Sequence, residues 1–398
     1  IEVKRRYYRD RETGEGKFLL DEALGLEPRQ RLSPWLRELA GKLAVEMPYH
    51  RAAGVLGELV PGVSAMGIWQ VVQRAGGRER SAAEAAQAAV FERGEAPMGE
   101  RRAEELCVEA DGVLIRRRSL GGRSRRIEVK LAVGYEGKEQ VAPGRKVLRE
   151  RRVVGAVAEP EAFWEQVVAD FARKWDWGSL KRCVVGTDGA AWLKAGCEYF
   201  PGALYRLDPY HLRRALVEGL AHDADAYVRV SEAVAAGDWS AVERALGEAE
   251  RGSRGECRRK VRALWNYLRE NWEGICSSGV GKRLGAIEGQ VFHHVGRRMK
   301  RHGARWSERG ADHLVRLLAA RANGELGKAL GGGRRARPEL LKVAVGSRMV
   351  ERDCGFGTDE DPGTWLRARV PALTGPYAGR PWVKYVLREL TRVGLEVS

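Results

Sequence analysis

The sequence predicts an α/β fold in which a mixed sheet lies between two helical regions. Between residues 105 and 207, apolar and alternating segments indicate three strands, a helix, a strand, a short helix and a last strand. Helical periodicity precedes this region over residues 33–93 and follows it over residues 209–320. The chain has 398 residues, 44% of them hydrophobic, which is enough for two or three domains with buried cores.

The N-terminal region is predicted to begin with a strand over residues 1–8 and to continue as helices. Ser33 and Pro34 form an N-cap and first-turn pair that starts a helix extending to about residue 45. A second amphipathic helix is expected over residues 49–59.

A third helix is expected over residues 65–74, capped by Ser64 and ended by Gly76 and Gly77. The Ala- and Glu-rich residues 81–93 indicate a separate connecting helix. Two short helices joined by a Gly-containing turn are typical of a helix-turn-helix, although any small three-helix bundle gives the same pattern. In the first case the side chains that read the major groove would be Gln70, Gln73 and Arg74.

The sheet region follows from residue 105. Residues 106–118 and 126–137 are expected to pair as a hairpin, and residues 146–156 supply a third strand. The continuous apolar residues 182–187 are typical of a central strand covered on both faces. The remaining elements are a helix that begins at Pro160, a short helix near Trp192 and a strand over residues 203–207.

The charge balance points to a polyanionic partner. Seventy Lys and Arg against 54 Asp and Glu give a net charge of +16, which favours nucleic acid; Arg-rich codon usage is the alternative. The six cysteines form no CxxC pair, which argues against a zinc knuckle and a disulfide framework. No segment reads as a membrane span or a signal peptide, so we expect a cytoplasmic protein that works on the nucleoid.

Three acidic residues stand out by their positions. Asp111 lies in the first strand of the sheet, and Asp188 follows the apolar strand where open α/β sheets place ligands. Glu288 falls on the apolar stripe of a helix expected over residues 282–301, so we expect it to face the buried side. Each has an ordinary alternative, since Asp-Gly is a common turn and a helical Glu is usually solvated. The stripe consists of Leu284, Val291, Phe292, Val295 and Met299.

A buried carboxylate is costly unless it meets a cation. Three carboxylates that converge at one sheet edge would bind hard divalent cations through oxygen, with Mg²⁺ preferred and Mn²⁺ able to substitute. Two such ions about 4 Å apart can activate a water or a 3′-hydroxyl for in-line attack on a phosphodiester.

At this point the sequence resembles a known group, the RNase H-like core of DDE transposases. It is similar in particular to a prokaryotic insertion-sequence transposase family related to the Mutator group, over residues 1–324. The blocks that carry the resemblance are KRRYYRDRETGE, LLDEALGL, EADGV, TDGAAW, LDPYHL and AIEGQVFHHVGRRMK.

The resemblance implies that Asp111, Asp188 and Glu288 are the catalytic, metal-binding triad of a metal-dependent transposase, with an all-helical insertion between the last two. Asp208 and His211 match an auxiliary Asp or Cys, two residues, then His of Mutator-type groups. His211 would be a structural partner of Asp208, an auxiliary metal ligand or a DNA contact. Such an enzyme binds the inverted repeats at transposon ends, cleaves there and transfers the strand to target DNA, as a homodimer or larger oligomer.

The expected organisation combines these elements with basic surfaces. A basic group after Glu288 would hold DNA phosphates, although a solvated helix end is the alternative; it comprises Arg297, Arg298, Lys300 and Arg301. The predicted parts are a DNA-binding module at 1–100, the first part of the core at 101–208, the helical insertion at 209–280, the catalytic helix at 281–325 and a basic linker with a C-terminal extension at 326–398.

Two other functions fit the same residues. A domesticated or truncated relative would keep the helix-turn-helix and bind DNA without cutting it. A structure-specific, metal-dependent nuclease would share the acidic site but lack strand transfer.

Overall fold

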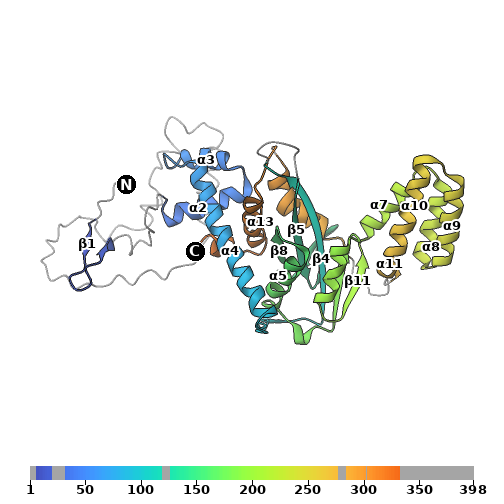
Figure 1. Ribbon diagram of the computed structural model, residues 1–398, viewed down its shortest axis with the longest axis horizontal. Coiled ribbons are helices and arrows are strands. Elements are labelled where there is room, and N and C mark those ends of the chain that lie inside the picture. The colour runs from blue at the N-terminus through green and yellow to red at the C-terminus, as the bar shows by residue number, and fades with distance from the viewer. Residues whose placement is uncertain (1–5, 20–31, 119–125, 277–283, 302, 332–398) are drawn as a thin grey trace. The chain divides into compact units, whose positions relative to one another are not determined.

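The computed structural model describes residues 6–19, 32–118, 126–276, 284–301 and 303–331 (Figure 1). The chain divides into two compact units, Ile1–Pro338 and Glu339–Ser398. The second unit lies outside the described residues, as do most of the predicted C-terminal extension and the first five residues of the predicted opening strand. Within the first unit the fold is mixed α/β, as predicted, with a mixed sheet and many helices.

A five-stranded sheet forms the centre of the fold. Its strands lie in the order β11, β10, β4, β5, β8. β4 pairs antiparallel with β5, and β5 with β8, whereas β10 runs parallel to both β4 and β11. The predicted hairpin and both later strands are therefore confirmed, the last two at the predicted bounds. The strands are β4 (Glu105–Arg116), β5 (Arg126–Tyr135), β8 (Arg152–Ala156), β10 (Arg182–Thr187) and β11 (Ala203–Leu207).

The single strand predicted over residues 146–156 is wrong, because the chain turns in the middle of it. β7 (Arg145–Arg149) pairs with β6 (Gly137–Ala142) in a separate hairpin, and only β8 joins the sheet. Glu150 stands between β7 and β8 with a φ of 53°, a left-handed conformation that ends an extended strand.

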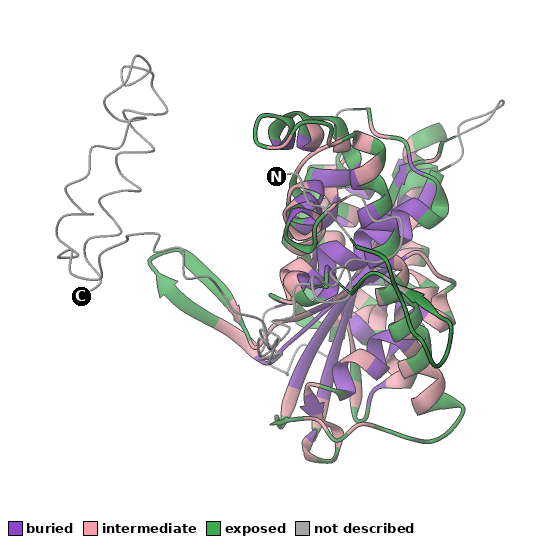
Figure 2. Ribbon diagram, turned by 90° about the vertical axis from the view of Figure 1, so that its left-hand side faces the viewer, coloured by how far each residue is buried: buried purple, intermediate pink, exposed green. Residues whose placement is uncertain are grey.

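Helices cover both faces of the sheet, whose strands are largely buried (Figure 2). α5 (Pro160–Ala172) packs Phe163, Trp164 and Phe171 against one face. The opposite face meets α12 (Ile287–Gln290), the π-helix η4 (Val291–Lys300) and α13 (Glu308–Ala322). The large fully buried aromatic side chains supply the largest single contributions to burial.

A group of five helices follows β11 and has its own hydrophobic core. Val230, Val242, Leu246 and Leu268 are fully buried in it. The helices are α7 (Pro209–Leu220), α8 (Ala224–Ala236), α9 (Trp239–Gly252), α10 (Gly255–Glu270) and α11 (Trp272–Cys276). The smaller elements of the chain are β1 (Tyr8–Arg9), β2 (Gly16–Lys17), β3 (Arg101–Arg102), β9 (Trp175–Asp176), η1 (Trp177–Ser179), α6 (Ala191–Lys194), η2 (Ala195–Tyr199) and α14 (Leu326–Ala329).

The first two N-terminal helices confirm the sequence prediction. α2 (Pro34–Glu46) begins at the predicted cap, where the Ser33 hydroxyl accepts a hydrogen bond from the Leu36 amide at 3.2 Å. α3 spans Tyr49–Gly57. Both helices pack on α4 (Ala65–Phe91), so the N-terminal part shares the core of the sheet face that carries α13.

The predicted end of the third helix at two glycines is wrong. α4 (Ala65–Phe91) runs through Gly76 and Gly77 as one helix of 27 residues. A Cβ at Gly76 would lie 2.4 Å from the His313 Cβ and 2.5 Å from the His313 carbonyl oxygen. The glycine therefore allows α4 and α13 to approach closely, and the cost of a helical glycine is offset by this packing.

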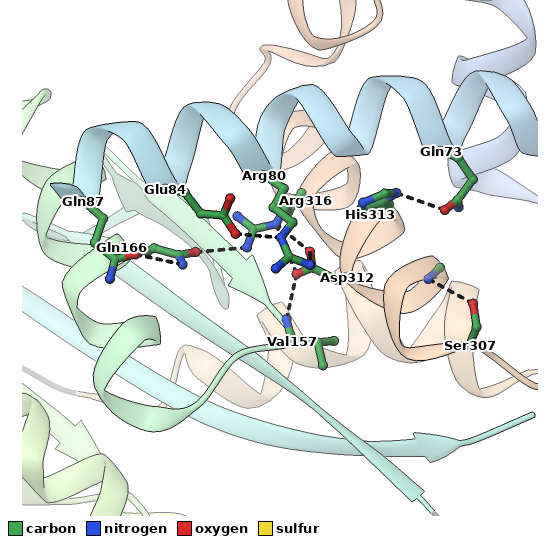
Figure 3. A network of polar contacts seen from close by, with 11 residues as sticks. Gln73, Arg80, Glu84, Gln87, Val157, Gln166, Ser307, Asp312, His313 and Arg316 are labelled. Atoms are coloured by element: carbon green, nitrogen blue, oxygen red, sulfur yellow. Dashed lines mark hydrogen bonds and ion pairs between the residues drawn. The ribbon is translucent and has the colours of Figure 1, made fainter. Parts of the chain in front are cut away.

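A buried polar network fastens the same two helices to the sheet (Figure 3). The Arg316 guanidinium donates to the Asp312 carboxylate at 3.1 Å and to the Gln166 side chain at 3.0 Å. Asp312 also accepts from the Val157 amide at 3.0 Å, just beyond β8. On α4, the Gln73 side-chain oxygen lies 2.9 Å from His313 Nδ1. Because these groups are buried, losing one partner would leave another unsatisfied.

The close approach of α4 and α13 predicts opposite effects for two adjacent glycines. Gly76→Ala should lower the free energy of unfolding by about 1–3 kcal/mol, because the added methyl group overlaps the His313 backbone. Gly77→Ala is the matched control: its Cβ would meet only the His313 ring at 3.6 Å, so the better helix propensity should make it neutral or stabilising. Urea unfolding of both variants checks this, and equal stabilities would contradict it.

Candidate active site

The register of the sheet brings the first two predicted acids together. β10 pairs with β4 in parallel so that Gly186 lies opposite Glu109. Asp188 comes two residues after Gly186, just beyond the end of β10, and Asp111 comes two residues after Glu109 on β4, so the parallel pairing brings both to the same end of the paired segment. Both side chains are partly buried. Asp111 accepts a hydrogen bond from the Gly112 amide at 2.7 Å, and Asp188 accepts one from the Ala190 amide at 2.8 Å.

Glu288 lies on the helix that crosses the same sheet face, but it is exposed and does not face the buried side as predicted. The predicted helix over residues 282–301 begins only at Ile287 in the described part of the chain, and from Val291 it is a π-helix. The wider turn buries Val295 and Met299, four residues apart, and leaves Phe292 49% exposed. The predicted stripe assumed 3.6 residues per turn throughout, and this is why it misplaced Glu288.

Glu109 anchors the start of this helix and is the residue that sequence reasoning missed. Its carboxylate is 1% exposed and accepts hydrogen bonds from the amides of Gly285 at 2.8 Å, Ala286 at 2.9 Å and Ile287 at 3.3 Å. The Tyr135 hydroxyl donates to the same carboxylate, and burial together with Glu109 raises the pKa of Tyr135. A carboxylate at a helix N-terminus satisfies otherwise unpaired amides, so Glu109 fixes the position from which Glu288 extends.

Asp208 and His211 form the predicted pair at the start of α7. Asp208 is 3% exposed, and its Oδ2 lies 2.9 Å from His211 Nδ1. The hydrogen bond to Asp208 raises the pKa of His211; burial opposes this, and Asp208, Asp188 and Asp111 add to it. The other oxygen of Asp208, Oδ1, is buried with no hydrogen-bond partner among the described residues. Asp208 thus orients His211, and the negative charges of Asp111 and Asp188 also act on its ring.

Side chains from the helical group hold the loop that carries Asp188. The Tyr267 hydroxyl donates to the Asp188 carbonyl oxygen at 2.8 Å. Asn271 accepts from the Tyr205 hydroxyl at 2.7 Å and donates to the Tyr267 carbonyl oxygen at 2.7 Å. Gly189 has a φ of +97°, and a Cβ there would lie 2.6 Å from Asn271 Oδ1. The loop therefore requires glycine, and it couples α10 to the candidate site.

An open groove of about 760 Å³ extends from these residues between α7 and α10. Asp188, His211 and Arg214 line the end of the groove nearest the acids, and Lys260 and Tyr267 line the wall formed by α10. Arg214 is paired with Glu218 at 2.7 Å. The lining combines charged side chains with small and apolar ones, such as Ala215, Val217 and Leu264.

The electrostatics of Asp111 show that the three acids influence one another. Burial raises the pKa of Asp111 to about 6; the Gly112 amide and His211 lower it, and Asp188 and Glu288 raise it further. A partly buried carboxylate among others is suited to a cation, and the donor set of carboxylate oxygens fits Mg²⁺. Among the residues that the structure describes, no group of three or more His, Cys, Asp or Glu side chains is gathered closely enough to hold a metal ion.

The three side chains predicted to contact DNA bases differ in their exposure. Gln70 and Arg74 are exposed on α4, beside a hollow of about 400 Å³ that they help to line. Gln73 is 8% exposed and bonded to His313, which corrects the expectation that it presents its side chain to DNA. Its position on the side of α4 that faces α13 is the physical reason.

The four basic residues after Glu288 also differ in their exposure. Arg297, Lys300 and Arg301 are exposed, whereas Arg298 is 6% exposed. The Arg298 guanidinium donates to the Ala44 carbonyl oxygen at 2.8 Å and lies 5.2 Å from the ring centroids of Tyr49 and Trp306. Arg298 therefore ties the π-helix to α2, which corrects its predicted role as a phosphate contact.

The anchoring role of Glu109 predicts a large effect of a small change. Glu109→Gln should lower the free energy of unfolding by about 2–4 kcal/mol, because the new NH₂ group must face backbone donors in a buried place. It should also speed hydrogen exchange at the amides of residues 285–291. Glu105→Gln on the same strand is the control, since its partly exposed pair with Arg182 at 3.3 Å contributes under about 1 kcal/mol. Unchanged exchange in the Glu109 variant would contradict the role.

The raised pKa of Asp111 predicts a stability change in metal-free protein. A carboxyl group whose pKa is about 6 when folded and 3.8 otherwise favours the protonated folded state, so its contribution is lost as pH rises from about 4 to 6. Asp111→Asn should therefore be more stable than the parent at pH 7.5, by up to about 3 kcal/mol, and should lose this advantage below pH 4. Chemical unfolding in EDTA measures the difference, with Glu218→Gln as an exposed control. Equal stabilities at pH 7.5 would contradict the burial of this charge.

The described helices include none that is both long enough and apolar enough to cross a membrane. Comparison with known proteins places the chain among proteins of unassigned activity. The model of the uncharacterised protein family UPF0236 matches residues 1–335.

Two of the relatives illustrate the similarity. A UPF0236 protein of Caldanaerobacter subterraneus subsp. tengcongensis, whose name joins eleven numbered loci, is 24% identical over 333 residues, covering 81% of this chain and 66% of the relative. The UPF0236 protein in the vanSb 3′ region of Streptococcus gallolyticus is 29% identical over 342 residues, covering 81% of this chain and 71% of the relative. The chain thus spans about two thirds of the length of the relatives it matches. Because the family model covers more than half of it, the chain belongs to the UPF0236 family.

Proposed function

We propose that this protein is a DNA transposase that binds transposon-end inverted repeats, cleaves a phosphodiester there and transfers the strand to target DNA. The observation that carries the proposal is electrostatic: two carboxylates from other elements, Asp188 and Glu288, both raise the pKa of Asp111. Asp111 lies on β4, Asp188 directly follows the adjacent parallel strand β10, and Glu288 lies on the helix anchored by Glu109.

The chain topology supports an RNase H-like assignment of the core. Asp111 lies on the first strand of the sheet, Asp188 directly follows the fourth, and Glu288 lies on a later helix. The helices α7 to α11 stand between the second and third acids, where the resemblance expects an insertion. The multiple loci joined in the name of one relative agree with a gene that is copied within a genome.

The residues divide the work of phosphodiester cleavage. Asp111, Asp188 and Glu288 would hold Mg²⁺ or Mn²⁺, which when bound supplies Lewis-acid stabilisation of the attacking and leaving oxygens. Asp208 holds the His211 ring by a hydrogen bond, and the raised pKa of His211, to which Asp188 and Asp111 contribute, favours a proton on the ring beside an anionic substrate. Arg297, Lys300 and Arg301 are exposed on the helix that carries Glu288 and can contact phosphates.

DNA recognition would fall to the N-terminal helices. Gln70 and Arg74 are exposed near the start of α4, where a major-groove helix presents its reading residues. With a net charge of +16 the protein would associate with nucleoid DNA in the cytoplasm, as a dimer or larger assembly that holds two transposon ends.

The triad predicts a loss of cleavage without a loss of binding. Asp111→Asn, Asp188→Asn and Glu288→Gln should each reduce Mg²⁺-dependent cleavage of a DNA ending in the element's inverted repeat by about a thousandfold, the equivalent of several kcal/mol of transition-state stabilisation. The measurement is product formation on a labelled duplex, with DNA affinity followed separately.

Glu243→Gln serves as the control, because it removes an exposed carboxylate on α9 that belongs to neither the triad nor the two grooves. Full cleavage by any one of the three triad variants would overturn the assignment. Cleavage at branched DNA without strand transfer would favour a structure-specific nuclease. Binding to the repeats by a parent protein that never cleaves would favour a non-catalytic relative.

A further inference from the structure

A second groove lies beside the helix that carries Glu288. It has a volume of about 730 Å³ and is formed by β7, the corner that follows β7, the turn after α5, the last residue of α12 and the start of the π-helix η4. Gln290 and His293 belong to its wall and lie two and five residues after Glu288. At about 1.5 Å per residue, they stand within about 8 Å of Glu288 along the helix axis. The remaining lining residues are Arg145, Lys146, Val147, Leu148, Glu150, Arg151 and Lys174.

The groove carries an excess of positive charge. Four of its lining side chains are Lys or Arg, and Glu150 is the one acid among them. Glu150 already pairs with Lys174 at 3.2 Å and with Arg101 at 3.5 Å. Arg145 and Lys146 are exposed on β7 and make no ion pair within the described ranges. Their charges are therefore available to a ligand.

Arg151 is the lining cation of this groove that neighbouring residues hold in place. It is partly buried, and its guanidinium donates to the Ala322 carbonyl oxygen at 2.7 Å and to Gln290 Oε1 at 3.4 Å. Neither partner is charged, and burial lowers the pKa of Arg151 with no carboxylate opposing it. A partly desolvated cation that meets only neutral acceptors gains most from an anion.

The chemistry of the lining indicates which anion fits. The cations come from separate elements and the groove is open, an arrangement that suits a chain of charges better than one small ion. Among the described residues that line it there is no Phe, Tyr or Trp, and the His293 imidazole is the one ring on which a base could stack. These features favour contact with a sugar-phosphate backbone, without base readout.

We propose that this groove binds the backbone of the DNA duplex that flanks the cleaved bond, with Arg145, Lys146 and Arg151 as phosphate contacts. The proposal rests on the proposed function for the position of the cleaved bond at Glu288. The groove itself is a sequence-independent site, distinct from the acids and from the reading residues of α4.

The test compares two double charge reversals in the full chain. Arg145→Glu with Lys146→Glu alters the groove, and Arg244→Glu with Arg251→Glu on α9 makes the same change in net charge elsewhere. All four side chains are exposed, so both variants should melt like the parent. Affinity for a labelled duplex of arbitrary sequence, about 20 base pairs long, is measured by fluorescence anisotropy across a series of salt concentrations.

The groove variant should lose at least tenfold in affinity at low salt. Its slope of log K against log salt should become shallower by about 2, because each lost phosphate contact removes about 0.9. The α9 variant should keep the parent slope. An unchanged slope in the groove variant, an equal loss in the α9 variant, or tighter binding of an RNA duplex than of the DNA would each overturn the proposal.

This assay needs no cleavage, so it remains decisive if the protein never cuts DNA. Failure of the triad variants to change cleavage would overturn the proposed function and leave the groove result standing. Conversely, a cleaving enzyme whose groove variant binds and cuts like the parent would leave the triad intact and remove the groove.

Discussion

The architecture of the candidate site depends on one buried carboxylate. The Glu109 carboxylate accepts hydrogen bonds from three consecutive backbone amides, from Gly285 to Ile287, and from the hydroxyl of Tyr135. These amides begin the helix that leads to Glu288, and the strand that carries Glu109 also carries Asp111 two residues later. A single side chain thus links two segments that are 176 residues apart in sequence. Its neighbours supply only donors, so the arrangement is satisfied only with an acceptor at this position.

The helix that follows connects the position held by Glu109 to the N-terminal part of the chain. Its π-helical turns bury Val295 and Met299 and direct Arg298 onto α2. Beyond it, α13 packs so closely on α4 that only glycine fits at position 76. A continuous path of packed elements therefore joins the sheet edge with the acids to the helix with the exposed Gln70 and Arg74. π-Helical segments are frequent at functional sites, where they redirect side chains from the positions that an α-helix would give.

Much of the fold could be predicted from local patterns. The apolar run at β10 and the Ser33 cap depend on neighbours in sequence, and both were predicted at their observed places. The wrong predictions concern positions whose conformation or exposure depends on contacts with residues distant in the sequence. Gly76 looked like a helix end because its partner, His313, lies 237 positions away; Gln73 and Arg298 looked like surface groups for the same reason. The sequence indicated the elements that carry the three acids, but the exposed side of Glu288 depends on the π-helix, which leaves no periodic signal of its own.

The length of α4 has a consequence for how the protein would be matched to DNA. Its 27 residues make a rod about 40 Å long, which exceeds one turn of the double helix, about 34–36 Å. The exposed Gln70 and Arg74 lie near the start of the helix, and its later part is bonded to α5 through Gln87 and Gln166. If the protein is the transposase proposed above, this rigid helix fixes the distance between the recognised base pairs and the cleaved bond, which must then be separated by a set number of helical turns. A mobile element using this protein would therefore have to keep that spacing in its ends as strictly as the recognised bases themselves.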